Sequence, residues 1–176
     1  MEKSLKSIAT NWGLYLGAGL ALITVLVYAI KLALFAEMWF GIILLIIMII
    51  IGIVAVAKVK QAQDGYASFK ESFTAFFITM LIAVLISTTV SYLLFNVVDT
   101  EAAVTLKDMT IDKTVAMMEG FNTPTEVIDQ TITQMEEQNQ YSIANILKGL
   151  AGNLVVMSII GLIVAAAMKK NNPNEA

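Results

Sequence analysis

The chain has 176 residues, of which 58% are hydrophobic and 14% are charged, and its formal net charge is −3. It contains no histidine, cysteine or arginine, so all 11 of its basic residues are lysines. This composition excludes serine–histidine triads, histidine or cysteine metal sites, histidine-ligated haem and disulfides. No basic patch is concentrated in the sequence, which argues against nucleic acid as a partner.

Four nearly uncharged stretches divide the chain, at residues 14–35, 39–57, 73–98 and 146–168. A membrane-spanning helix needs about 20 apolar residues, and each stretch is long enough to supply them. The sequence therefore predicts an all-α polytopic membrane protein with four transmembrane helices. A cleaved signal peptide is the alternative for the first stretch, which is longer than the usual signal core of about 7 to 15 residues.

The lysines give these helices an orientation. Lysines precede the first stretch, lie in the link 58–72 and follow the fourth stretch, whereas the link 99–145 has two lysines and nine carboxylates. Since basic loops stay in the cytoplasm, we expect both termini to be cytoplasmic and residues 99–145 to be periplasmic. The chain then divides into a region 1–98 with three helices, an acidic helical insertion 99–145, and a region 146–176 with the fourth helix and a tail.

The third helix has a clear start signal. Ser68 and Glu71 form a capping box, in which the serine oxygen accepts from the backbone of Glu71 and the carboxylate reaches back. Asp64 and Gly65, just upstream, are typical of a turn. We therefore expect helices two and three to form a tight antiparallel hairpin, with the third helix starting near Ser68.

The acidic insertion contains two helical patterns. The first consists of apolar or small residues at helical spacing, Ile111, Thr114, Val115 and Met118, and Gly120 is its candidate C-cap. The second begins with a capping box at 123–126 that has proline at its first helical position. Interfacial helices usually present lysine or arginine to anionic lipid, so the acidic faces favour packing of the two helices on each other.

Lys31 interrupts the first apolar stretch near its outer end. A charge inside a membrane is costly and marks a functional site by default. Here the long side chain can snorkel to the interface and meet Glu37 across the short turn. We interpret Lys31 and Glu37 as interface anchors, and an ion or substrate site at Lys31 is the alternative.

Small residues recur along three of the four predicted helices. They are Gly13 and Gly17 in the first, Thr79, Ala83, Ser87 and Ser91 in the third, and Gly161 and Ala165 in the fourth. Such residues let helix backbones approach closely, and hydroxyls can bond across helices. We predict helix-packing faces within the bundle or between subunits, with a polar path for a solute along the third helix as the alternative.

No residue pattern in the insertion predicts a metal or cofactor. Asp99, Glu101, Asp108 and Asp112 supply oxygen ligands, but their spacing matches no calcium loop and indicates a solvated acidic face. The methionines of this link lie at helical spacing, which is typical of packing rather than of a soft-metal site. We expect no cofactor and no catalytic residue.

Two segments of the chain resemble a known family. They are Gly65-Tyr66-Ala67-Ser68-Phe69-Lys70-Glu71-Ser72-Phe73 before the third helix and Val98-Asp99-Thr100-Glu101 after it. The order of features is similar to that of the bacterial membrane family called domain of unknown function 4199, in which a proline usually stands at the place of Thr100. The resemblance implies four spans and a location in the bacterial inner membrane, and it supplies no catalytic residues.

Together these features predict a non-enzymatic membrane protein, an accessory, scaffold or sensor subunit. Its expected partners are the lipid bilayer and a membrane or periplasmic protein that binds residues 99–145; a homo-oligomer is a further hypothesis. The alternative is a small oligomeric transporter or channel lined by the face that carries Thr79, Ala83, Ser87 and Ser91.

Overall fold

A computed structural model of the chain describes residues 4–138 and 142–172. These two ranges consist of helices joined by turns and contain no strand. The elements in chain order are α1 (Leu5–Ile30), the 3-10 turn η1 (Leu32–Ala36), α2 (Met38–Ala62), α3 (Phe69–Leu93), the π-helical turn η2 (Leu94–Val98), α4 (Thr100–Gly120), α5 (Thr125–Glu137) and α6 (Ile143–Met168). The predicted all-α architecture is confirmed.

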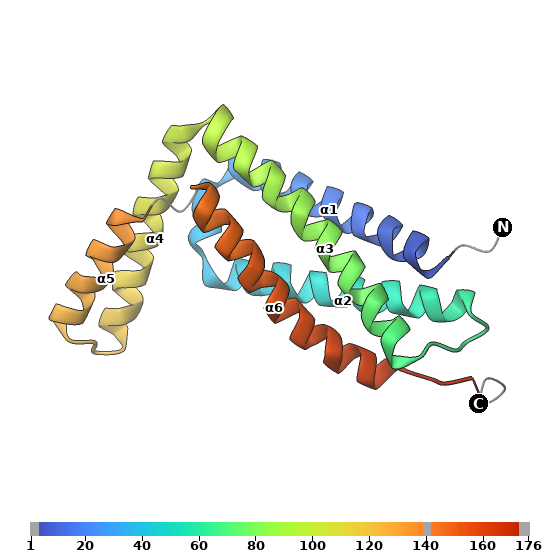
Figure 1. The fold of residues 1–176 in the computed structure, drawn as a ribbon. Helices are drawn as coiled ribbons and strands as arrows, with labels where there is room; N and C mark the ends of the chain where they lie inside the picture. Colours follow the sequence, from blue (N-terminus) through green and yellow to red (C-terminus); the bar gives the residue numbers. More distant parts are fainter. Residues whose placement is uncertain (1–3, 139–141, 173–176) are drawn as a thin grey trace.

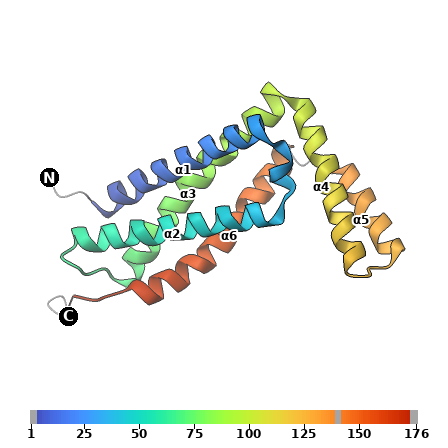
Figure 2. The same ribbon diagram turned by 180° about the vertical axis from the view of Figure 1, so that it is seen from behind.

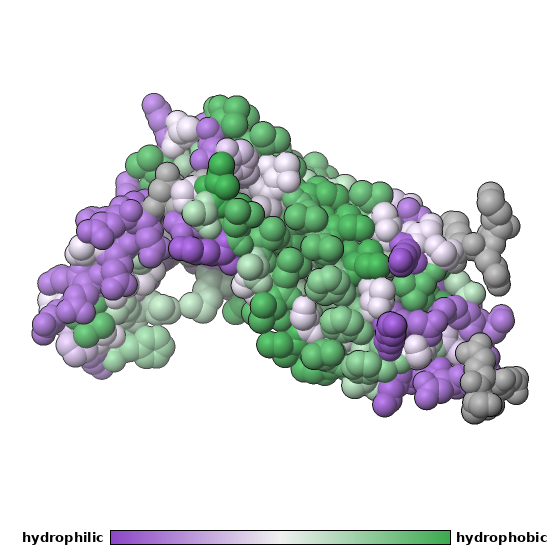
Figure 3. Space-filling view, viewed as in Figure 1, coloured by the Kyte–Doolittle hydropathy of each residue, from purple (hydrophilic) through white to green (hydrophobic). Residues whose placement is uncertain are grey.

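Four helices are long and apolar enough to span a membrane: α1, α2, α3 with its continuation η2, and α6. They form a bundle in which α3 packs on the other three (Figure 1). The start of α1, the α2–α3 turn and the end of α6 lie at one end, and α4 and α5 lie at the other (Figure 2). Figure 3 shows apolar residues over the middle of the bundle and hydrophilic residues at both ends, so the predicted membrane protein with four spans is confirmed.

The helix limits differ from the apolar stretches. α1 begins at Leu5, where Ser4 caps it by accepting from the backbone N–H of Ser7 (3.3 Å). It ends at Ile30, and Lys31 is its C-cap rather than a residue inside the helix. Hydropathy marks the part of a helix that suits hydrocarbon, whereas backbone hydrogen bonding continues through polar residues that tolerate a helix. The first predicted span is therefore shifted relative to α1.

The α2–α3 hairpin follows the predicted turn chemistry. Asp64 and Gly65 both have positive φ, 54° and 85°, a region that glycine enters freely and aspartate tolerates better than most residues. The backbone N–H of Ser68 donates to Glu71 Oε2 (2.7 Å), and the backbone N–H of Glu71 donates to Ser68 Oγ (3.3 Å). The predicted turn and capping box are both confirmed.

The end of α6 is fastened to this hairpin. Ala67 and Lys170 exchange two backbone hydrogen bonds of 2.9 and 2.8 Å. The Lys60 ammonium donates to the carbonyl of Met168 (2.9 Å), and Lys170 Nζ lies 5.0 Å from the centre of the Tyr66 ring. The chain after the fourth span is thus tied to the turn between the second and third spans, a contact that the sequence did not predict.

The centre of the bundle is Phe76 of α3, which is fully buried. A Cβ on Gly52 of α2 would lie 2.4 Å from Phe76 Cε2, and a Cβ on Gly161 of α6 would lie 2.8 Å from Phe76 Cδ1. Real side chains do not approach so closely, so the absence of a Cβ at these two positions lets three helices close on one ring.

The predicted pair of helices in the acidic link is present as α4 and α5, which we call the arm. α5 packs only on α4 among the described elements, whereas α4 also packs on η1 and η2. In both views α4 runs across the end of the bundle instead of continuing along its axis (Figures 1 and 2). We call the end of the bundle that α4 crosses the arm end.

Two predictions about the turn of the arm are wrong. The left-handed residue that closes α4 is Asn122 (φ 54°), not Gly120, and the N–H of Thr123 then donates to the carbonyl of Met118 (3.0 Å). This is the closure expected of a Schellman motif, and asparagine tolerates it. The second predicted capping box does not form, because Pro124 is the N-cap of α5 and no side chain accepts there.

Candidate functional site

An apolar cluster, which we call the arm joint, fixes the root of α4 to the bundle. Its buried members are Leu94, Phe95, Ala102 and Leu106, and Tyr28, Leu32, Phe35, Ala36 and Ala103 pack around them. The Phe95 ring meets Tyr28 and Phe35 edge-on, with ring centres 6.3 and 5.9 Å apart. Because this cluster joins α1, η1, η2 and α4, the first half of α4 cannot move without disrupting packed aromatic rings.

Asp99 forms the polar part of the arm joint. Its carboxylate accepts from the Tyr28 hydroxyl (2.7 Å) and from the backbone N–H of Ala102 (2.9 Å), so it is the N-cap of α4. The hydrogen bond from Tyr28, followed by that from Ala102, holds the pKa of Asp99 below its ordinary value. Asp99 is therefore a structural carboxylate and not part of a solvated acidic face.

A salt bridge also joins the arm to the start of α2. Lys113 of α4 donates to Glu37 at 2.8 Å, with side chains 55% and 30% exposed. The hydrogen bond from Lys113 is the main cause of a lowered pKa of Glu37, and the charges of Lys113 and Lys31 act in the same direction. The salt bridge of Glu37 is thus with a residue of the arm, and Lys31 acts on it through charge from the end of α1.

The acidic ridge of α4 is formed by Glu101, Asp108, Asp112 and Glu119, all of which are exposed. At 3.6 residues per turn, their spacing of seven, four and seven residues keeps them within about 40° of one another. Leu106 of the arm joint lies on the opposite face of α4. Within the described residues, no group of three acidic side chains is placed to hold a metal ion.

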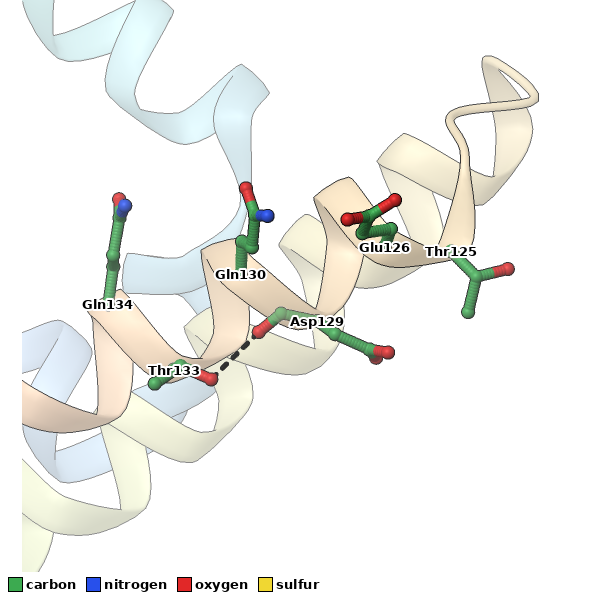
Figure 4. Close-up of a pocket in the computed structure, with 6 residues that line it drawn as sticks. All are labelled: Thr125, Glu126, Asp129, Gln130, Thr133 and Gln134. Carbon is green, nitrogen blue, oxygen red and sulfur yellow. Dashed lines mark hydrogen bonds between the residues drawn. The ribbon is translucent and has the colours of Figure 1, made fainter.

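The polar face of α5 borders a surface hollow of about 570 Å³. Its lining is Thr125, Glu126, Asp129, Gln130, Thr133 and Gln134. In Figure 4, Glu126, Gln130 and Gln134 point to the same side of the helix, and the Thr133 hydroxyl donates to the carbonyl of Asp129 (2.9 Å). All six residues come from one helix, so this is an open polar face and not an enclosed pocket.

The structure places half of the predicted small residues in a tight seam between α1 and α3. A Cβ on Gly13 or Gly17 would lie 2.8 or 2.7 Å from isoleucine side chains of α3. Ala83 is buried, as is Thr79, whose hydroxyl contacts the carbonyls of Ala9 (3.1 Å) and of Ala75 in its own helix (2.8 Å). The seam therefore contains two of the four residues of the polar face predicted on the third helix, Thr79 and Ala83.

The other half of that face, Ser87 and Ser91, lines a groove of about 320 Å³ between α3 and α6. Thr88, Tyr92, Asn145, Gly149 and Asn153 also line it. In the C-terminal part of α6, Gly161 and Ala165 are buried. The predicted face is therefore divided: Thr79 and Ala83 lie inside a packed seam, and only Ser87 and Ser91 border open space.

Two residues of interest were missed at the level of sequence. Lys148 is an exposed charge in the second turn of α6, and its position in the fourth apolar stretch was visible in the sequence. Lys113 was missed as the partner of Glu37 because the two residues belong to different segments, and no local pattern links them.

Comparison with curated proteins and with solved structures gave no match. A family model described as "Protein of unknown function (DUF4199)" matches residues 11–170, a range that contains the arm and nearly all of the four spans. The segments that carry the earlier resemblance, 65–73 and 98–101, lie within this range, at the two ends of the third span formed by α3 and η2. The chain therefore belongs to the DUF4199 family.

Proposed function

We propose that the chain is a non-enzymatic protein of the bacterial inner membrane that holds the acidic ridge of its arm in a fixed position for a partner protein. In this role it is an accessory, scaffold or sensor subunit. The observation that carries the proposal is the arrangement of α4, which is rooted in the bundle on one face and carries four exposed carboxylates on the other.

The fixed root is what makes the ridge suitable for recognition. A surface that is already ordered loses less conformational entropy on binding than a flexible one. Four carboxylates of one sign attract a basic partner surface over several ångströms and accelerate encounter. The partner is therefore expected to present lysine or arginine to α4, and its binding is expected to weaken as salt concentration rises.

Charge at the two ends of the bundle supports a periplasmic arm. Lys58, Lys60, Lys169 and Lys170 gather at the end that holds the start of α1 and the end of α6, opposite the arm. The positive-inside rule favours a cytoplasmic location for such an end. The absence of histidine and cysteine supports a non-enzymatic role, because histidine is the side chain used most often for acid–base catalysis and cysteine is an intrinsically strong nucleophile.

The test neutralises the ridge in the full-length protein. The variant Glu101→Gln, Asp108→Asn, Asp112→Asn, Glu119→Gln is purified from native membranes in mild detergent, and its co-purifying proteins are quantified by mass spectrometry against the wild type. A matched control removes four carboxylates from α5 instead, through Glu126→Gln, Asp129→Asn, Glu136→Gln and Glu137→Gln. Both variants change the net charge equally.

The proposal expects a partner that is present with the wild type and with the α5 control, and that is lost with the ridge variant. Equal loss with both variants would indicate nonspecific attraction to charge and would contradict the ridge as a binding surface. Retention of every partner by the ridge variant would contradict it as well.

The groove between α3 and α6 supports a second candidate, a small oligomeric transporter or channel. Ser87, Ser91 and Asn153 present polar groups there, and another subunit would be needed to enclose a path. Solute flux in proteoliposomes that is reduced by Ser87→Ala together with Ser91→Ala would favour this function. Absence of flux for ions and small polar solutes, with monomeric behaviour in nanodiscs, would contradict it.

A further inference from the structure

α4 has three faces with different surroundings. Ala103, Leu106, Thr110 and Thr114 lie on the face toward the bundle, and the acidic ridge lies on the opposite face. Between them is the face toward α5, and α4 is the only element on which α5 packs within the described residues. The direction of each side chain of α4 relative to the bundle is therefore fixed by its position along the helix.

The face toward the bundle continues past the part that the bundle covers. A hollow of about 280 Å³ separates it from the start of α2, and its lining includes Met38, Thr114 and Met117. Phe121, the C-cap of α4, follows Met117 by four residues, so helical geometry places it toward the same face, about 6 Å farther along the helix axis. Met117 is 42% exposed and Phe121 is 79% exposed, so two large apolar side chains extend beyond the bundle.

The level of these side chains is set by the membrane spans. Met38 and Trp39 begin α2, one of the four candidate spans, and both are exposed. Tryptophan at the end of a span is typical of the membrane interface. Met117 lies across the hollow from Met38, at the level where α2 begins, and α4 runs across the bundle end in both views (Figures 1 and 2).

We propose that the second half of α4 rests on the bilayer, with Met117 and Phe121 inserted at the boundary between headgroups and acyl chains beside the bundle. An interfacial helix buries its apolar face about 5–10 Å into this zone. The arm then has two supports, the arm joint at its root and lipid under its tip. This role does not depend on the proposed partner, which would bind the opposite face.

The acidity of the arm is compatible with this placement. Asp108, Asp112 and Glu119 lie on the side of α4 opposite Phe121, so the helix that contacts lipid keeps its carboxylates in water. Lys113 and Glu37, which line the same hollow as Met117, form a salt bridge and neutralise each other. Contact with lipid is therefore expected to rest on apolar burial and not on attraction to anionic headgroups.

The absence of native cysteine makes the test direct. Single cysteines are introduced as Met117→Cys and Phe121→Cys on the proposed lipid face, and as Asp112→Cys and Glu119→Cys on the ridge as matched controls. Each variant carries a nitroxide label and is reconstituted at low protein density in vesicles of zwitterionic phosphatidylcholine. Collisions of the label with oxygen and with a water-soluble nickel chelate report its depth.

The proposal expects labels at 117 and 121 to collide more with oxygen and less with nickel than labels at 112 and 119, whatever the salt concentration. Equal exposure to nickel at all four positions would overturn it. Protection of 117 and 121 that disappears on dilution into excess lipid would identify a second copy as the occupant and would also overturn it. So would protection seen only in native membranes, which would identify a different protein.

Discussion

The glycine at the centre of the bundle gives the sharpest stability prediction. In Gly52→Ala the new methyl group would start 2.4 and 2.7 Å from Phe76 ring atoms and 2.8 Å from Met80 Cε. Favourable carbon contacts are about 3.5–4.0 Å, so the ring must retreat by about 1 Å. It cannot retreat freely, because Gly161 of α6 closes the opposite side of the ring.

Overpacking of this kind costs about 1–3 kcal/mol. Alanine also favours a helix over glycine by about 1 kcal/mol, so the cost must be measured against a control in which only propensity changes. Gly41→Ala is that control, because Gly41 lies in the same helix and has nothing within 4 Å of its added Cβ. We expect Gly52→Ala to be less stable than Gly41→Ala by about 1–3 kcal/mol.

The assay is thermal unfolding of the purified variants in detergent, followed by the loss of the monodisperse peak in size-exclusion chromatography. For a chain of this size, 1 kcal/mol corresponds to about 2–4 °C in Tm. Combining Gly52→Ala with Phe76→Leu should recover part of the loss, because the two residues are in contact and their effects are coupled. Equal Tm values for Gly52→Ala and Gly41→Ala would refute the inference that this glycine is required for close approach.

Three further predictions concern single polar contacts. Thr79→Val keeps the shape of the side chain but removes its hydrogen bond across the α1–α3 seam. We expect it to lower the free energy of unfolding in SDS by about 0.5–1.5 kcal/mol. Thr89→Val, whose hydroxyl bonds only within its own helix on the exposed surface, should have no effect. Ser68→Ala removes the cap of α3 and should cost about 0.5–2 kcal/mol in the same assay; unchanged stability would contradict the capping role. The lowered pKa of Glu37 means that its bond to Lys113 stabilises the docked arm above the ordinary pKa of glutamate, and that this contribution is lost as pH falls through the lowered value. Spin-label distances between α2 and α4 should therefore broaden in acid, and Lys113→Met should remove the contribution of this pair to the change.

Local signals in the sequence were sufficient to predict the four spans and the α2–α3 hairpin. Apolar stretches predict four spans because hydrocarbon admits few charges, and the Ser68–Glu71 capping box involves residues only three apart. The turn at Asp64 and Gly65 follows from the φ values that these residues tolerate. In each case the physical cause lies within a few residues of the feature.

Features that depend on distant residues were not predictable from one sequence. The partner of Glu37 comes from α4, and the hydroxyl that bonds to Asp99 comes from α1. The close of α4 was misplaced because Gly120 and Asn122 are both suitable residues for the left-handed position, and the sequence does not distinguish between them. Residues four apart advance by about 40° around an α-helix, so Thr79 and Ser91 point about 120° apart. Packing of α1 and α6 on α3 then decides what each part of that face meets.

The two segments that carry the family resemblance lie at opposite ends of the third span, α3 with η2, and both join helices. At one end Ser68 and Glu71 cap α3, and Ala67 pairs with the chain after α6. At the other end Asp99 caps α4 and holds Tyr28 of α1. Side chains bonded in this way fix geometry and have little capacity left for a ligand. If the family shares a molecular role, we expect it on the surfaces that these joints orient, and the arm, whose root Asp99 positions, is one of them.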